Sequence, residues 1–263
     1  MTLTSAAVEI LSTADPAHKA RLSHEAARSW RAGSLEVGAA PPPARPARPE
    51  RPVLLPPGEM PKRKAGAGSR RRIALLHALA HIELNAIDLA WDLIARFATP
   101  ELPRAFFDDW VTVADQEAAH YELVAARLGA LGSAYGELPA HDGLWQAAAE
   151  TSCDLLARLA IAPLVLEARG LDVTPAMIAT LRRNGDEASA AALEVIYREE
   201  IDHVATGKRW FDSLAIARGL EPLTAFHALV RRHFRGLLKP PFNDAARTAA
   251  GFEAAFYAPL AVR

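Results

Sequence analysis

Apolar residues recur every three or four positions over long stretches of this chain, which is the period of an amphipathic α-helix. Alanine and leucine dominate these stretches, and β-branched and aromatic residues are sparse, so helix is favoured over strand. The pattern predicts four long helices, over 70–98, 103–131, 142–169 and 186–217. They are more than twice the average helix length, and long helices joined by short loops are typical of an antiparallel bundle. The sequence therefore predicts an all-α fold built on a four-helix bundle.

Shorter helices are expected on either side of these four. The segment 4–32 is helical with a break at Asp15-Pro16, and Thr174-Pro175 has the form of a helix start, which predicts a short helix over 175–184 after an end near Gly170. A terminal helix over 222–237 is followed by a proline break and an irregular tail.

Residues 38–66 are so rich in proline that neither helix nor sheet can form there. The segment is either a linker or an extended arm that wraps the helices, and the apolar cluster Val53, Leu54 and Leu55 favours the arm. The predicted organisation is an N-terminal helical extension, the arm, a four-helix bundle with an added C-terminal helix, and a tail, over 1–37, 38–68, 69–240 and 241–263.

Charge and cysteine content narrow the class of protein. The formal net charge is −1, which gives no global field toward nucleic acid or membrane. The single cysteine, Cys153, excludes a disulfide framework and a four-cysteine metal centre, and we expect it to be a small core residue. No secretory signal is visible, and no apolar run approaches the roughly 18 residues that span a bilayer. These features predict a soluble, cytoplasmic protein.

Two segments have the form Glu-x-x-His, Glu117-Ala-Ala-His120 and Glu200-Ile-Asp-His203, on two different long helices. Residues three apart share one face of a helix, so the carboxylate and imidazole of each pair point the same way. One such pair arises easily by chance, whereas two pairs on separate helices indicate metal ligation.

The other two long helices each carry a glutamate among apolar neighbours, Glu83 and Glu167. A buried lone carboxylate is costly unless something pairs with it, and a metal cation is an efficient partner, with an ordinary ion pair as the alternative. Glu83 precedes Glu117 by 34 residues and Glu167 precedes Glu200 by 33, which is an internal pseudo-repeat. Glu83 and Glu117 also lie at matching distances from the turn between their helices, so they are expected to face each other.

This ligand pattern resembles the ferritin-like di-iron carboxylate superfamily. The chain further resembles a bacterial ferritin-like domain family of unknown function in the segments HALAHIELNAIDLAWD, EARGLDVTP and EEIDH. A more distant resemblance is to the di-iron tRNA hydroxylases. The resemblance implies a ferritin-like bundle that binds two metal ions. The metal ligands would be the following: Glu83, Glu117, His120, Glu167, Glu200 and His203. Four carboxylates and two imidazoles suit iron, and manganese or zinc would also fit.

Groups around the ligands are expected to orient the two histidines. The candidates are Glu199, Gln116 and Asp202, with exposed helix-face charge as the alternative for each. Asp88 and Asp92 point well away from Glu83 and are weaker candidates. His77 and His81 also point away, which predicts a packing or surface role.

The function expected from these residues is that of an oxidoreductase, a di-iron oxygenase or hydroxylase that activates dioxygen. Its electrons would come from an external reductase, because the chain has no flavin, nicotinamide or iron–sulfur motif, and its small organic substrate is not identified. One alternative is iron handling or peroxide scavenging without an organic substrate, and another is a purely structural bundle. Basic clusters in the arm and near Arg231 leave tRNA open as a partner, although solvated charge is the plainer interpretation.

Overall fold

The computed structural model describes residues 1–56, 59–60 and 68–261. They form two compact units, Met1–Trp145 and Gln146–Arg263. Throughout the described part of the chain the regular structure is helical, accompanied by three isolated β-bridges and no strand. The expected all-α class is confirmed, whereas a single ferritin-like bundle that combines helices of both units stays a prediction.

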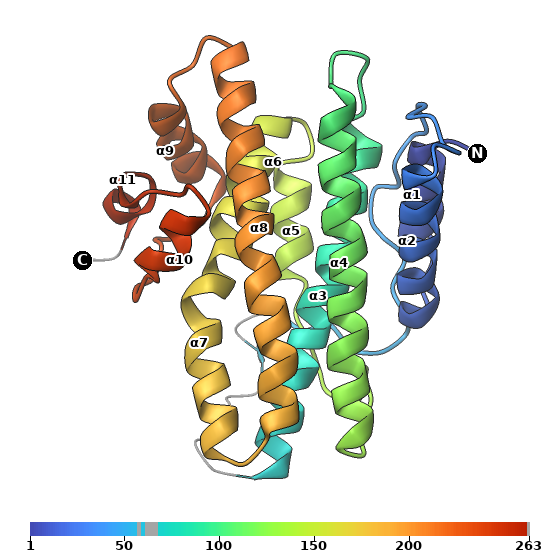
Figure 1. The fold of residues 1–263 in the computed structure, drawn as a ribbon, viewed down its shortest axis with the longest axis vertical. Helices are drawn as coiled ribbons and strands as arrows, with labels where there is room; N and C mark the ends of the chain where they lie inside the picture. Colours follow the sequence, from blue (N-terminus) through green and yellow to red (C-terminus); the bar gives the residue numbers. More distant parts are fainter. Residues whose placement is uncertain (57–58, 61–67, 262–263) are drawn as a thin grey trace. The chain divides into compact units, whose positions relative to one another are not determined.

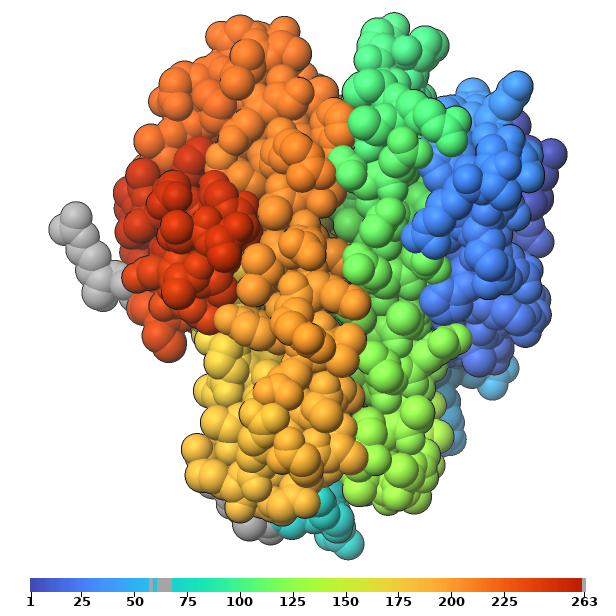
Figure 2. All heavy atoms as spheres, in the orientation of Figure 1, coloured from blue at the N-terminus to red at the C-terminus, as the bar shows by residue number. Residues whose placement is uncertain are grey.

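The first unit is built on a helix hairpin, α3 (Ser69–Phe97) followed by α4 (Arg104–Ala130). Helix α1 (Leu3–Leu11) packs against α3, and α2 (Pro16–Arg31) packs against α4 (Figure 1). The break at Asp15-Pro16 is confirmed, because the Asp15 side chain caps α2 by accepting a hydrogen bond from the backbone N–H of His18. Figure 2 shows the N-terminal residues, in blue, covering one side of α4, in green.

The proline-rich segment contacts the helices of the first unit along residues 43–55. The guanidinium of Arg96 donates to the carbonyl of Pro43 at 2.9 Å, and the N–H of Ala47 donates to the carbonyl of Leu11 at 2.7 Å. The N–H of Leu55 donates to the carbonyl of Ala140 at 2.8 Å. These contacts are those of an arm, and the remainder of its predicted range, at 57–58 and 61–67, lies outside the described residues.

Val53 is not the apolar anchor that the sequence suggested. Its side chain is 60% exposed, and its carbonyl instead accepts from the N–H of Ala140 at 3.1 Å. Backbone pairing and arginines do the anchoring, since Arg45 pairs with Asp142 and Arg48 pairs with Asp88.

The second unit holds a continuous helical run opposite α8 (Glu187–Ala217). The run begins with α6 (Leu155–Ile161), passes through a π-helical turn η2 (Ala162–Glu167) and continues as α7 (Ala168–Arg183). A short turn joins α7 to α8, and the two pack as a hairpin (Figure 1). Helix α5 (Gly143–Glu150) precedes the run, and α9 (Pro222–His233) follows α8.

The expected helix over 142–169 and the separate helix over 175–184 are therefore wrong in their boundaries. The interruption falls at 151–154, where the Asp154 side chain caps α6, and neither Gly170 nor Thr174-Pro175 breaks the run. Pro175 cannot donate a hydrogen bond to the carbonyl of Leu171. Asn243 supplies that bond instead, because its side-chain amide donates to the Leu171 carbonyl at 3.1 Å. A donor from the C-terminal segment thus lets the helix pass through the proline.

The C-terminal segment is not the irregular tail that was expected. It forms α10 (Asp244–Ala249), α11 (Ala254–Tyr257) and a 3-10 turn η3 (Ala258–Leu260). Arg247 of α10 is almost fully buried and donates to both carboxylate oxygens of Asp172, at 2.9 and 2.7 Å. Its guanidinium also lies 4.4 Å from the ring centroid of Tyr257. In Figure 2 these residues, in red, pack against the orange surface of the same unit.

Two further expectations are settled by burial. Cys153 is exposed rather than in the core, because it falls in the interruption between α5 and α6.

Helix α3 is long and apolar enough by composition to cross a membrane, contrary to the sequence analysis, but 67% of its most apolar window is buried inside the fold. That burial is what a core helix of a soluble protein shows.

Candidate metal centre

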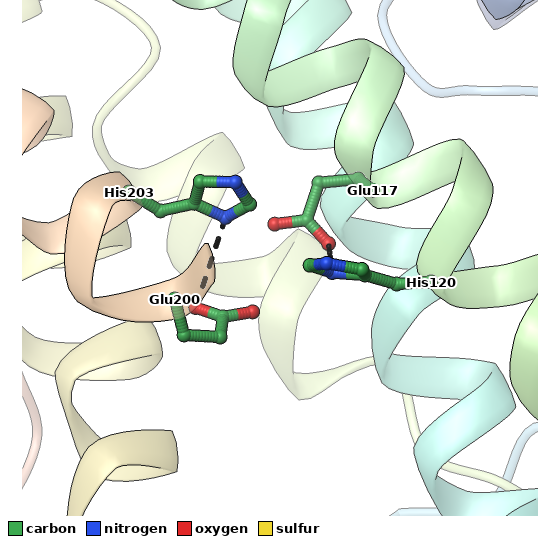
Figure 3. A group of neighbouring side chains, drawn as sticks. All are labelled: Glu117, His120, Glu200 and His203. Carbon is green, nitrogen blue, oxygen red and sulfur yellow. Dashed lines mark ion pairs between the residues drawn. The ribbon is translucent and has the colours of Figure 1, made fainter. Parts of the chain in front are cut away.

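Helix α4 places Glu117 and His120 one turn apart on its buried face. Both side chains are fully buried, and the Oε2 atom of Glu117 lies 3.4 Å from the Nδ1 atom of His120 (Figure 3). The two side chains converge because positions three apart on a helix lie on the same face. The structure also identifies Nδ1 as the imidazole nitrogen that faces the carboxylate, which the sequence could not do.

Glu83 reaches the same imidazole from α3. Its Oε2 atom lies 3.6 Å from Nδ1 of His120, and its side chain is 3% exposed. The expected level matching of Glu83 with Glu117 is therefore confirmed within the first unit. Two carboxylates from facing helices converge on one ring nitrogen; we call Glu83, Glu117 and His120 the first half-site.

Burial and mutual charge shift the proton affinities of this half-site. The pKa of Glu83 is raised to about 7, chiefly because burial disfavours the carboxylate; hydrogen bonding to His120 opposes this rise, and repulsion from Glu117 adds to it. Burial by itself would lower the pKa of His120, but hydrogen bonding and attraction to Glu117 and Glu83 outweigh it and raise the pKa to about 12. The carboxylates thus favour a positive charge at His120, and they would favour a bound metal cation for the same reason.

Helix α8 repeats the arrangement in the second unit. The Oε2 atom of Glu200 lies 3.9 Å from Nδ1 of His203, and the two side chains are 13% and 1% exposed (Figure 3). Glu167 is the last residue of the π-helical turn η2 and is partly buried. We call the three predicted ligands Glu167, Glu200 and His203 the second half-site; that Glu167 joins this pair stays a prediction. Here too Nδ1 is the nitrogen that faces the carboxylate.

Both pairs have the chemistry of a metal site. Glu117, His120, Glu200 and His203 are all residues that could contribute a ligand atom to a metal ion. Carboxylate oxygens and imidazole nitrogens suit first-row transition metals, and iron, manganese and zinc all accept such ligands. The donor set therefore fits the metal that the sequence analysis expects, without selecting which one.

The residues proposed to orient the histidines have differing exposure. Gln116 and Glu199 are partly buried, and Asp202 is exposed on α8. Their role toward His120 and His203 stays a prediction.

Several polar residues of α3 serve the packing of the first unit instead of the metal centre. Asp88 is fully buried and pairs with Lys19 of α2 and Arg48 of the arm. Asp92 pairs with Arg96 one turn later, at 2.6 Å. Sequence reasoning missed Lys19, although a lysine within the stripe of small residues on the buried face of α2 is the signal that could have found it.

His77 and His81 anchor the loop after α4, as the packing interpretation predicts. The Nε2 atom of His77 accepts from the backbone N–H of Gly136 at 2.9 Å. The Nδ1 atom of His81 lies 2.8 Å from the hydroxyl of Tyr135, and burial lowers the pKa of His81 to about 4. The Nε2 atom of this neutral imidazole lies 3.0 Å from the carbonyl of His141 and donates to it, so Nδ1 accepts from the Tyr135 hydroxyl.

The fold and these pairs define an all-helical protein with two buried glutamate–histidine groups of metal-ligating type. Residues 12–258 match the model of the family described as "Protein of unknown function (DUF455)", and the chain belongs to that family. A relative from Haemophilus influenzae, described as "Uncharacterized protein", is 42% identical over 209 residues, which cover 78% of this chain and 72% of the relative. No solved structure matches the chain.

Proposed function

We propose that this protein is a di-metal carboxylate protein that binds two ions, with iron as the physiological metal and the residues of the two half-sites as its ligands. The observation that supports it best is the first half-site, where two buried carboxylates from different helices converge on one imidazole nitrogen, at 3.4 and 3.6 Å. The second Glu-x-x-His pair repeats the same chemistry on α8.

The ligand set carries a functional consequence. A pair of bound iron ions would supply redox chemistry with dioxygen. Glu83, Glu117, Glu167 and Glu200 would bind the metal through carboxylate oxygens, and His120 and His203 through Nδ1. Burial of Glu83, Glu117, His120 and His203 would exclude bulk water and strengthen their interaction with cations.

We further infer that the activity is an oxidation of a small organic substrate by dioxygen, in the cytoplasm, with electrons delivered by a separate reductase. The family description brings no substrate with it. The alternative function is iron handling or peroxide scavenging. An iron store differs from an oxygenase in the number of metal ions bound per chain, which is many for a store and about two for an oxygenase.

Metal analysis of protein purified without added metal is the decisive experiment. We expect about two metal ions per chain in the parent and a clear loss in Glu117→Ala. Glu122→Ala is a matched control, since it removes a glutamate of the same helix whose side chain is 54% exposed. Fewer than one ion in the parent, or equal metal content in both variants, contradicts the proposal.

Oxygen consumption separates the two functions. An oxygenase should consume dioxygen only when both a reductant and a substrate are present, and a small-molecule screen with dithionite or a ferredoxin–reductase pair would reveal it. A large particle with many irons per chain would favour iron storage instead.

A further inference from the structure

The π-helical turn η2 carries a ligand of the second half-site at its last position. It spans Ala162–Glu167 and has Pro163 near its start. Proline has no backbone N–H to donate to the carbonyl four residues earlier, so a regular α-helical bond is missing here. Single π turns inside α-helices are rare and occur frequently at functional sites. The local chain geometry at Glu167 is therefore set by an irregular turn, which needs support from outside the helix.

Helix α8 provides that support at Gly207. A Cβ atom added at Gly207 would lie 2.4 Å from Cβ and 2.5 Å from Cγ of Pro163. Real Cβ atoms do not approach other atoms this closely, so the two helices meet at a distance that only glycine permits. The backbone of Gly207 is ordinary helix, with no positive φ, so space rather than conformation requires the glycine.

The contact lies one helical turn from a ligand on each helix. Pro163 precedes Glu167 by four residues, and Gly207 follows His203 by four. Because the two helices pack as a hairpin, four residues forward on one and four residues back on the other lead in the same direction. The Pro163–Gly207 contact thus sets the spacing of the helices next to the level at which Glu167 and His203 lie.

The C-terminal end of the turn is held as well. Arg247 donates from Nη2 to the carbonyl of Ala168 at 3.2 Å, directly after Glu167, and to Asp172 one turn later at 2.7 Å. The turn is therefore fixed on one side by packing and on the other by hydrogen bonds from a buried guanidinium.

We propose that Pro163 and Gly207 are positioning residues for the second half-site, which hold Glu167 at the distance from His203 that a shared metal ion requires. The inference rests on the proposed function. Metal–ligand distances tolerate errors of only a few tenths of an ångström, whereas a methyl group at Gly207 would have to move a helix or the turn by more than that. Supporting residues of this kind typically alter metal affinity by about 10- to 100-fold.

The test is a titration of the full chain with Co²⁺, followed by its absorption bands and by calorimetry. We expect Gly207→Ala to bind about 10- to 100-fold more weakly than the parent. Gly170→Ala is the matched control, because Gly170 lies in the adjoining helix α7 and a methyl group there meets nothing within 4 Å. It should bind as the parent does, apart from the small effect of an alanine in a helix.

The double variant distinguishes positioning from general destabilisation. In Gly207→Ala/Pro163→Gly the Cβ and Cγ atoms that the new methyl group would meet are both removed, so affinity should recover above that of Gly207→Ala alone. Strictly additive losses would overturn the proposal. If Gly207→Ala does not fold, Pro163→Ala alone must bind Co²⁺ more weakly than the parent, and parent-like affinity would overturn it equally.

The same titration separates this inference from the proposed function. A parent that binds no Co²⁺ contradicts the di-metal function itself. A parent that binds about two ions, together with Gly207→Ala that binds as tightly as Gly170→Ala, leaves the di-metal function standing and refutes the positioning role.

Discussion

Glu83→Gln replaces a buried carboxyl group by a neutral amide of similar shape and tests the electrostatics of the first half-site. In the metal-free protein, burial raises the pKa of Glu83 from its ordinary value of 4.5 to about 7. The folded state therefore holds this proton more tightly than the unfolded chain does. The stability that the proton contributes is fully present below pH 4.5 and is lost as the pH rises through 7.

The size of the effect follows from the two pKa values of Glu83. One unit of pKa difference corresponds to about 1.4 kcal/mol, and integration from pH 4.5 to 6.5 gives a loss of about 2 kcal/mol. His120 interferes little in this window, because its folded pKa of about 12 and its ordinary value of 6.5 leave it largely protonated in both states. We expect Glu83→Gln, which has no proton to lose, to gain about 2 kcal/mol on the parent over the same interval.

Urea unfolding of both proteins in a chelating buffer, at a series of pH values, measures this difference directly. Comparison with Glu83→Gln cancels the contributions of the other titrating groups to first order. A difference in unfolding free energy that stays constant with pH refutes the account. Added metal should reverse the order at neutral pH, because the parent then gains binding energy that the variant has lost.

Two buried contacts give further predictions, each measured by urea unfolding. Lys19→Met leaves the buried Asp88 with Arg48 as its one cationic partner among the described residues and should cost about 3 kcal/mol. Arg21→Met on the same helix breaks an exposed ion pair and should cost less than about 1 kcal/mol, and equal losses would contradict the buried pairing. Asn243→Ala removes the donor to the Leu171 carbonyl and the side-chain cap of α10, and should cost about 2 kcal/mol. The control Glu253→Ala removes no capping hydrogen bond and should be near neutral. A neutral Asn243→Ala would mean that α7 does not need this donor to pass Pro175.

The chemistry of the ligand pairs is determined by local sequence alone. Glu117 and His120, or Glu200 and His203, share a face because of the helical period, whatever surrounds the helix. The break at Asp15-Pro16 and the hairpin of α3 and α4 are equally local, because a capping side chain and prolines near the turn act on the residues beside them. Even the meeting of Glu83 with Glu117 followed from counting residues back to the turn.

Tertiary structure determined the features that depend on residues far away in the sequence, namely the course of α7 through Pro175 and the pairing of Asp88. Gly170 and Pro175 have the local signals of a helix end, yet α7 continues because Asn243, 72 residues after Leu171, donates the bond that proline lacks. Asp88 was a candidate near the metal, and only folding shows that Lys19 and Arg48, 69 and 40 residues away in sequence, neutralise it. A helix boundary or a buried charge depends on the partner that satisfies it, and no local pattern of residues specifies a partner so far away along the chain.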